Sequence, residues 1–202
     1  AAGTVVEQPA PTVARTGRVT LRWNGGDPGI DVRRSHPFVT VQRLVGGSWR
    51  TAFTDDSYQD TTERTGRDVW TEIVQFTECD ALGRYRIVVD GLADKGDGVK
   101  PYRVISNEFQ LQAVALQPGT PTVDGETARV KARYPAPAAG SLLAVPRLVQ
   151  TGSATLSVTP PGGTPQTVTA QPETGTGAFA ATVPAGSQVE LVSVRDACGN
   201  TA

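Results

Sequence analysis

The feature that most constrains the fold is the alternation of apolar and polar residues in short segments separated by glycine and proline. Residues 127–134 read TARVKARY and residues 18–23 read RVTLRW. Successive side chains of a strand point to opposite faces, so each segment has one apolar and one polar side. The chain has 22 glycines and 15 prolines, which favour turns between strands. No stretch of eleven residues shows a convincing helical period, and the pattern predicts an all-β protein.

The predicted strands form two sets on either side of residues 117–126, QPGTPTVDGE. The first set is 18–23, 38–45, 48–53, 69–76, 84–90 and 107–114, and the second is 127–134, 142–149, 154–159, 166–170, 178–183 and 188–194. Short strands at this spacing are typical of β-sandwiches. We therefore predict two tandem immunoglobulin-like β-sandwich domains, over 15–114 and 115–202, preceded by a linker over 1–14.

A β-hairpin is predicted where Gly46-Gly47 separates two of these strands, because both glycines tolerate the positive φ angles of a two-residue turn. His36, the one histidine of the chain, lies just before this hairpin. A catalytic histidine needs a partner and an orienting group, for which Asp31 and Asp55 are the candidates. Its place before Pro37, at the start of a strand, favours a surface histidine instead. No serine lies in a Gly-x-Ser-x-Gly turn.

The formal net charge of −1 gives no electrostatic reason to expect nucleic acid as a partner, and it limits any lipid contact to a weak or aromatic one. No apolar run approaches the length of a transmembrane helix. The chain contains no methionine, which we interpret as a mature secreted product or a piece of a longer protein. We therefore expect a secreted or cell-surface location.

Two stretches of the sequence resemble one known family. GGDPGIDVRRSHPFVTVQRLVGGSWRTAFTDDSYQD and GRYRIVVDGLADKGDGVKPYRVISNEFQL are similar to the C-terminal immunoglobulin-like domain of neutral/alkaline ceramidases, over about residues 15–112. The matching positions are Gly26, Pro28, Arg33, Phe38, Val41, Arg43, Trp49, Thr54, Asp55 and Asp56, followed by Gly83, Tyr85, Arg86, Ile87, Gly91, Gly98, Val99, Pro101, Tyr102, Ser106 and Phe109. Tyr58 and Val74 depart from the family pattern. The closing VRDACGNTA is similar to the end of many bacterial immunoglobulin-like domains.

The resemblance implies that the chain is the non-catalytic C-terminal region of a secreted ceramidase-like enzyme that hydrolyses N-acylsphingosine. The family keeps its zinc ligands and its nucleophile in a separate catalytic domain, so we expect no catalytic residue and no cofactor in this chain, and zinc only in that domain. One histidine and two cysteines also fall short of a catalytic zinc site, which takes three protein ligands. The expected partners are a catalytic domain of the same parent and a weakly bound lipid surface.

Two acidic segments are candidates for calcium, which prefers carboxylate and carbonyl oxygens. They contain Asp55, Asp56 and Asp60 in one loop, and Asp94 and Asp97 in another. Neither has the spacing of a known calcium loop, so the alternative is that these carboxylates are solvated turn residues.

Aromatic residues could form a face that contacts lipid or sugar, but alternation favours core positions for Trp23 and Trp49. Trp70 shares a face with Glu72 and Val74, and its strand could be buried on both sides.

Cys79 and Cys198 are the only cysteines. In an up-and-down arrangement of strands, Cys79 precedes a strand that begins at the end of the first domain nearest the second domain. If the second domain has an even number of strands, Cys198 lies at the end of that domain nearest the first domain. Both cysteines then fall at the predicted domain interface, where a disulfide would stabilise the chain by roughly 4–5 kcal/mol. The alternative is two unpaired buried thiols.

Three functions therefore compete. The first is the non-catalytic ceramidase region just described, packing on its catalytic domain and helping to orient it at a lipid surface. The second is a structural or adhesive module of a cell-surface protein. The third, a carbohydrate-binding module, requires a row of exposed aromatic rings, and most aromatic residues here are expected in the core.

Overall fold

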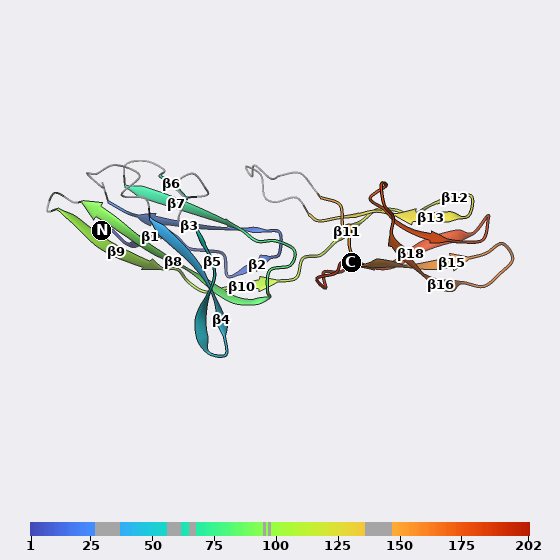
Figure 1. Cartoon of the computed structure of the whole chain (residues 1–202), viewed down its shortest axis with the longest axis horizontal. Coiled ribbons are helices and arrows are strands. Elements are labelled where there is room, and N and C mark those ends of the chain that lie inside the picture. Colours follow the sequence, from blue (N-terminus) through green and yellow to red (C-terminus); the bar gives the residue numbers. More distant parts are fainter. Residues whose placement is uncertain (27–36, 56–61, 65–67, 95, 97, 136–146) are drawn as a thin grey trace. The chain divides into compact units, whose positions relative to one another are not determined.

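In the computed structural model, the chain divides into two compact units, Ala1–Gln112 and Ala113–Ala202 (Figure 1). The structure describes residues 1–26, 37–55, 62–64, 68–94, 96, 98–135 and 147–202, with the backbone alone at 55 and 62–64. Every regular element in this part of the chain is a β-strand. The predicted all-β fold with tandem immunoglobulin-like sandwiches is confirmed.

The first unit contains two sheets. One has the strand order β1 (Thr4–Glu7), β3 (Arg18–Asn24), β7 (Val69–Gln75) and β6 (Thr62–Arg64). The other has the order β2 (Thr12–Ala14), β10 (Phe109–Gln112), β8 (Gly83–Asp94), β4 (Phe38–Val45) and β5 (Ser48–Asp55), with β9 (Val99–Ile105) paired to β8. The second sheet carries most of the features that matter below.

Strand β8 organises this second sheet because three other strands pair with it. β4 lies along one edge, while β10 and β9 share the other edge, next to the start and the end of β8 respectively. Ser106 lies between the end of β9 and the start of β10, next to β8. Its hydroxyl accepts a hydrogen bond from the Ile87 amide at 2.8 Å and donates one to the Asn107 carbonyl at 2.8 Å.

The core of the first unit is rich in aromatic rings. Phe76 lies edge-to-face against Phe53, Tyr85 and Phe109, and Tyr85 stacks on Phe109. The Tyr85 hydroxyl donates a hydrogen bond back to the Ala81 carbonyl, which gives the buried polar atom a partner. These edge-to-face contacts stabilise the core beyond the burial of area alone.

A second aromatic group holds β9 onto the core. Trp23 is fully buried, and its indole N–H donates a hydrogen bond to the Tyr102 hydroxyl at 2.9 Å. The Tyr102 ring lies directly over Gly91, where a Cβ atom would come within 2.3 Å of it. A glycine is therefore required on β8 at this point of close approach.

Several expectations for the first unit need correction. Residues 1–14 are not a linker, because β1 and β2 pair with β3 and β10 and belong to the first unit. β9 was not predicted as a strand. Trp49 is only half-buried and lies outside the hydrophobic core, unlike Trp23. Burial on both sides of β7 is not observed, because Trp70, Glu72 and Val74 are buried while the intervening residues are partly exposed.

The second unit has a two-stranded sheet and a six-stranded one. β11 (Gln117–Pro118) pairs with β14 (Ala132–Arg133). The larger sheet has the order β12 (Thr122–Asp124), β13 (Thr127–Val130), β17 (Phe179–Thr182), β16 (Gln166–Pro172), β15 (Ser153–Thr159) and β18 (Gln188–Arg195). The alternating segment 127–134 divides into β13 and β14, and residues 142–146 of the predicted strand 142–149 lie outside the described residues.

A buried polar network closes the second unit. One oxygen of the Asp196 carboxylate accepts hydrogen bonds from the Tyr134 hydroxyl and the Asn200 side chain, both at 2.7 Å. The other oxygen accepts from the amides of Cys198 and Asn200 at 3.0 and 2.8 Å. The Asn200 side-chain oxygen in turn accepts from the Val114 amide at 3.1 Å. The network gives a physical role to the motif VRDACGN noticed in the sequence: it ties the end of the unit to its beginning.

Candidate interaction surfaces

The face of β4, β8 and β9 that points away from the core has exposed apolar side chains among its polar ones. Four large side chains on it are substantially exposed: Phe38 (42%), Leu92 (37%), Val99 (42%) and Ile105 (49%). Val88, on the same side of β8, is buried but does not belong to the hydrophobic core of the unit. We call this surface, formed by Phe38, Val88, Leu92, Val99, Pro101 and Ile105, the outer face.

The register shows that these residues are neighbours. Val88 lies opposite Ile105, Leu92 opposite Pro101, and Asp94 opposite Val99. Phe38 lies opposite Asp90 on the other edge of β8. The solvent side of an antiparallel sheet is usually polar, so this exposed apolar surface marks a candidate contact site.

One ion pair crosses the outer face. Arg103 Nε lies 3.0 Å from an Asp90 carboxylate oxygen, and both side chains are about half exposed or more. A pair this exposed contributes little to stability, on the order of 1 kcal/mol or less. It does, however, place two hydrogen-bonding groups among apolar neighbours, where they can fix the orientation of a partner.

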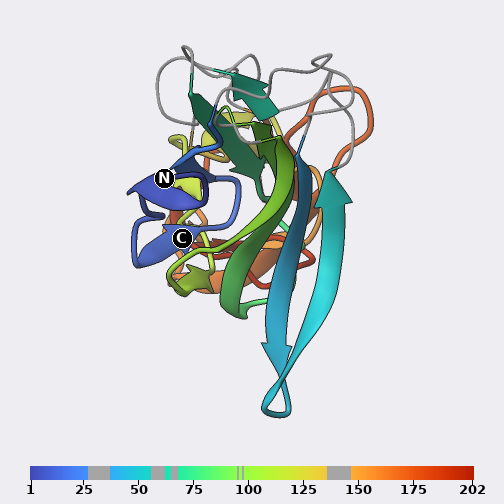
Figure 2. The same cartoon turned by 90° about the vertical axis from the view of Figure 1, so that its left-hand side faces the viewer.

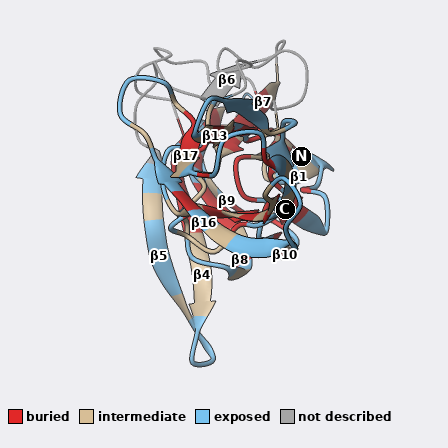
Figure 3. Cartoon of the chain, turned by 90° about the vertical axis from the view of Figure 1, so that its right-hand side faces the viewer, coloured by how far each residue is buried: buried red, intermediate tan, exposed pale blue. Residues whose placement is uncertain are grey.

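The β4–β5 hairpin forms a second candidate surface. The predicted two-residue turn is confirmed, since Gly46 and Gly47 both have positive φ angles, of 57° and 81°. Pairing of β4 with β8 ends at Arg43, so the last part of the hairpin extends beyond the sheet (Figures 1 and 2). Burial along the strands shows the same end of the hairpin exposed (Figure 3).

Arginine residues lie on both faces of this hairpin near its free end, Arg43 and Arg50 on one face and Arg86 of β8 on the other. Arg43 and Arg50 are cross-strand partners. The guanidinium of Arg43 donates two hydrogen bonds to the Leu82 carbonyl, at 3.0 and 2.6 Å. The Arg86 guanidinium lies 4.4 Å from the centre of the Trp49 ring, a cation–π contact. A hollow of about 360 Å³ lies on the face of Arg43 and Arg50, lined by Arg43, Val45, Arg50, Thr51, Ala52, Phe53, Asp80, Ala81 and Tyr85.

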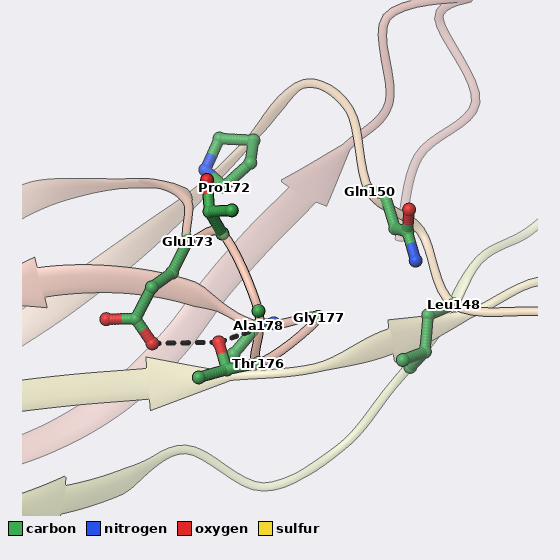
Figure 4. Close-up of a pocket in the computed structure, with 9 residues that line it drawn as sticks. Leu148, Gln150, Pro172, Glu173, Thr176, Gly177 and Ala178 are labelled. Atoms are coloured by element: carbon green, nitrogen blue, oxygen red, sulfur yellow. Dashed lines mark hydrogen bonds between the residues drawn. The ribbon is translucent and has the colours of Figure 1, made fainter.

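The second unit has an open pocket of about 530 Å³ at the β16–β17 loop (Figure 4). Glu173, the one charged residue among the described residues of its lining, pairs with Arg129 at 2.8 Å and accepts a hydrogen bond from the Thr176 hydroxyl at 2.8 Å. These hydrogen bonds, with that from Arg129 the strongest influence, lower the pKa of Glu173. The carboxylate is thus already engaged, and the residues described in the lining of this pocket include no aromatic side chain that could stack on a sugar ring.

Most of the acidic and histidine candidates from the sequence lie outside the described residues: His36, Asp56, Asp60 and Asp97, together with the side chain of Asp55. Asp94 is described, and its carboxylate accepts a hydrogen bond from the Gly96 amide at 2.8 Å, as turn residues do. Within the described ranges, no group of three or more His, Cys, Asp or Glu side chains could hold a metal ion. Calcium binding stays a prediction.

The predicted disulfide is present. Cys79 and Cys198 are both disulfide-bonded, and because the chain has two cysteines they are bonded to each other. Such a bond indicates an oxidising environment. In the described part of the chain, no helix is both long and apolar enough to cross a membrane.

These features define a class of structure: an all-β chain of two immunoglobulin-like units, with an apolar sheet face on the first. The sequence matches the family described as neutral/alkaline non-lysosomal ceramidase, C-terminal, over residues 1–111. The chain therefore belongs to this family, which confirms the resemblance seen in the sequence. The match begins at residue 1, in agreement with the place of β1 and β2 in the first unit.

Among solved structures, the neutral ceramidase of Pseudomonas aeruginosa is similar to this chain with 21% identity and a TM-score of 0.45. The similarity covers 56% of this chain and 19% of that one. A ceramidase complexed with C2 gives 20% identity, a TM-score of 0.44 and coverage of 55% and 19%. The ectodomain of the teleost fish polymeric immunoglobulin receptor gives 11% identity and a TM-score of 0.30, with coverage of 93% and 91%. No curated protein matches the chain.

Proposed function

We propose that this chain is the non-catalytic C-terminal region of a secreted, ceramide-hydrolysing parent enzyme of the N-acylsphingosine amidohydrolase type, and that its first unit packs on the catalytic domain through the outer face. The family match supports this assignment, because the family is the C-terminal part of such enzymes. The chain spans about a fifth of the length of the solved ceramidases, 19%. In the same proposal, the chain helps to orient the enzyme at a lipid surface.

The observation that carries the docking role is the outer face itself. Its apolar side chains are aligned by the strand register and project from a rigid sheet, and burying them against a folded partner removes apolar surface from water. The Asp90–Arg103 pair supplies polar groups at the centre of the same surface. Apolar residues around a few oriented polar groups are typical of permanent domain interfaces.

The test uses the parent polypeptide. First, the gene that encodes the parent is sequenced upstream of the codon for residue 1. The catalytic segment and this chain are then produced separately and mixed. We expect the two to elute together, and we expect Leu92→Arg with Ile105→Arg to weaken the complex by about tenfold or more, because both side chains lie in the apolar surface. Titration calorimetry measures the affinity.

Val123→Arg with Val192→Arg is the matched control, since both residues are exposed (38% and 60%) in the second unit and lie outside the outer face. Equal loss of affinity in the control would contradict docking through the outer face. An upstream sequence of further sandwich repeats, without a histidine-bearing catalytic region, would reject the ceramidase proposal in favour of an adhesive module.

A further inference from the structure

The β4–β5 hairpin has a free end. Leu44, Val45, Ser48 and Trp49 pair across the hairpin beyond the point where β4 leaves β8. A Cβ atom built on Gly46 or Gly47 would meet no described atom within 4 Å. The turn therefore projects into open space, as Figure 2 shows, and is available to a partner.

The charge of this hairpin differs from that of the chain as a whole. Residues 38–53 contain two arginines and no acidic residue, and the one acidic residue of the hairpin, Asp55, ends β5 far from the turn, although the net charge of the chain is −1. Arg43 and Arg50 lie directly opposite each other, an arrangement that destabilises a sheet in water because like charges repel. Asp80 lies beside them in the lining of the same hollow, and its carboxylate accepts a hydrogen bond from the Thr77 amide at 2.6 Å. An anionic partner would relieve the repulsion between the two arginines.

Beyond the arginines, the hairpin ends in apolar side chains. Leu44 lies opposite Trp49, and Val45, next to the turn, is 38% exposed. Leu82, whose carbonyl holds Arg43, is 40% exposed. Tryptophan is enriched at membrane–water interfaces, where its ring contacts apolar groups while its edge stays in contact with water.

We propose that the tip of the β4–β5 hairpin inserts into the headgroup region of an anionic membrane. In this arrangement Val45, Leu44 and Trp49 enter the boundary between headgroups and acyl chains, and Arg43, Arg50 and Arg86 lie at the level of the lipid phosphates. Apolar and cationic groups in this order match the two layers of a bilayer surface, which supports a membrane rather than a soluble anion. The chain has no overall positive charge to draw it from a distance, so binding is weak and depends on salt.

This inference rests on the lipid-orienting part of the proposed function and identifies the element and the lipid charge involved. It is tested with the 202-residue chain and phosphatidylcholine vesicles containing about one third phosphatidylserine, since each arginine near such a surface adds measurably to binding. Co-sedimentation should show binding to these vesicles, less binding to phosphatidylcholine alone, and a decrease with added salt.

Two variants locate the contact. Val45→Glu with Arg50→Glu should reduce binding by roughly tenfold or more, because the first brings a charge to the tip and the second reverses one. Val192→Glu with Lys131→Glu makes the same change of charge at exposed positions of the second unit and should bind like the unaltered chain. Arg50→Lys keeps the charge and should retain binding.

A third variant separates folding from binding. Arg50→Gln should keep or raise the unfolding temperature, because it removes the repulsion from Arg43, and should still weaken vesicle binding. Absence of binding to the anionic vesicles, or equal loss in the control pair, would overturn the proposal. The proposal would also be overturned if the chain bound no vesicles and Arg50→Glu no longer eluted together with the catalytic segment. The hairpin would then belong to the contact with the catalytic domain. The vesicle assay contains no catalytic domain, so its failure leaves docking through the outer face untouched.

Discussion

The two units have the same class of fold but fill their interiors differently. The first packs Trp23, Phe76, Tyr85 and Phe109 against one another. The second packs small side chains around one phenylalanine, with Ala128, Ala132, Ala154, Ala170 and Phe179 all buried, and adds the polar network of Asp196. The comparison shows that the core of an immunoglobulin-like sandwich can be held in one arrangement either by packed aromatic rings or by buried hydrogen bonds.

Removal of one ring should have the largest effect. Phe76→Ala is expected to destabilise the first unit by about 3–5 kcal/mol, because Phe76 is fully buried and contacts three other rings. Denaturant unfolding followed by tryptophan fluorescence reports on this unit, which contains all three tryptophans. Phe38→Ala on the outer face is the control, and an equally large loss there would contradict the ring cluster as the main source of stability.

The corresponding change in the second unit removes its polar centre. Asp196→Ala should destabilise that unit by about 3 kcal/mol, because the Tyr134 hydroxyl and the side chain and amide of Asn200 lose their acceptor while still buried, and the part-buried Cys198 amide loses it too. Unfolding followed by circular dichroism measures the change, and Asp124→Ala, at an exposed position, should have little effect. A loss below about 0.5 kcal/mol would show that the network is not what holds the unit together.

Acid should weaken the same network less severely. Burial alone would raise the pKa of Asp196, but hydrogen bonds from Asn200, from Tyr134 and from the backbone of Asn200 and Cys198 outweigh it and hold the pKa below its ordinary value of 3.8. The folded state thus binds this proton less readily than the unfolded state. The stabilisation is complete above pH 3.8 and is lost as the pH falls through the lower folded-state value.

The protonated carboxyl keeps part of its hydrogen bonding, so the effect of acid should be smaller than that of Asp196→Ala. Thermal unfolding across this pH range measures it. The Asp196→Asn chain cannot take up the proton at this position and should lack that component of the pH dependence. Identical acid sensitivity in the two chains would assign the effect to other carboxylates.

The smallest expected change concerns the bond between Trp23 and Tyr102. Tyr102→Phe should destabilise the first unit by about 1 kcal/mol, because the buried indole N–H loses its acceptor while the ring remains over Gly91. Chemical denaturation of the variant beside the unaltered chain is the measurement. Val99→Ala, at an exposed position of the same strand, is the control and should have little effect. A neutral result would show that the ring alone holds β9 in place.

The sequence predicted strands best where one face is buried. Residues 18–23 and 154–159 alternate without interruption, and both are strands with alternating burial. β9 was missed because Pro101 interrupts its pattern and because both of its faces contain apolar residues. Trp49 was assigned to the core because alternation shows which residues share a face but not where a hairpin extends beyond the sheet.

The outer face left one signal in the sequence. The run Ile87-Val88-Val89 interrupts the alternation of β8, and such a run indicates burial on both sides of a strand. The rest could not be predicted, because Phe38, Leu92 and Ile105 become neighbours only through the pairing of β4, β8 and β9. The arginine pair at the hairpin likewise follows from register, although Gly46-Gly47 fixes that register and was identified in advance.

The position of Pro101 in β9 has a consequence for self-association. Among the described strands, β9 pairs only with β8, so it forms an edge of its sheet. Proline has no amide hydrogen to offer an incoming strand, and the neighbouring Lys100 adds a charge that repels a like edge. Further along, Gly3 of the amino-terminal segment lies close to the Arg103 carbonyl and covers that part of the edge. The first unit therefore resists growing into a continuous intermolecular ribbon, and its exposed apolar residues can remain on the surface without leading to fibrous aggregates.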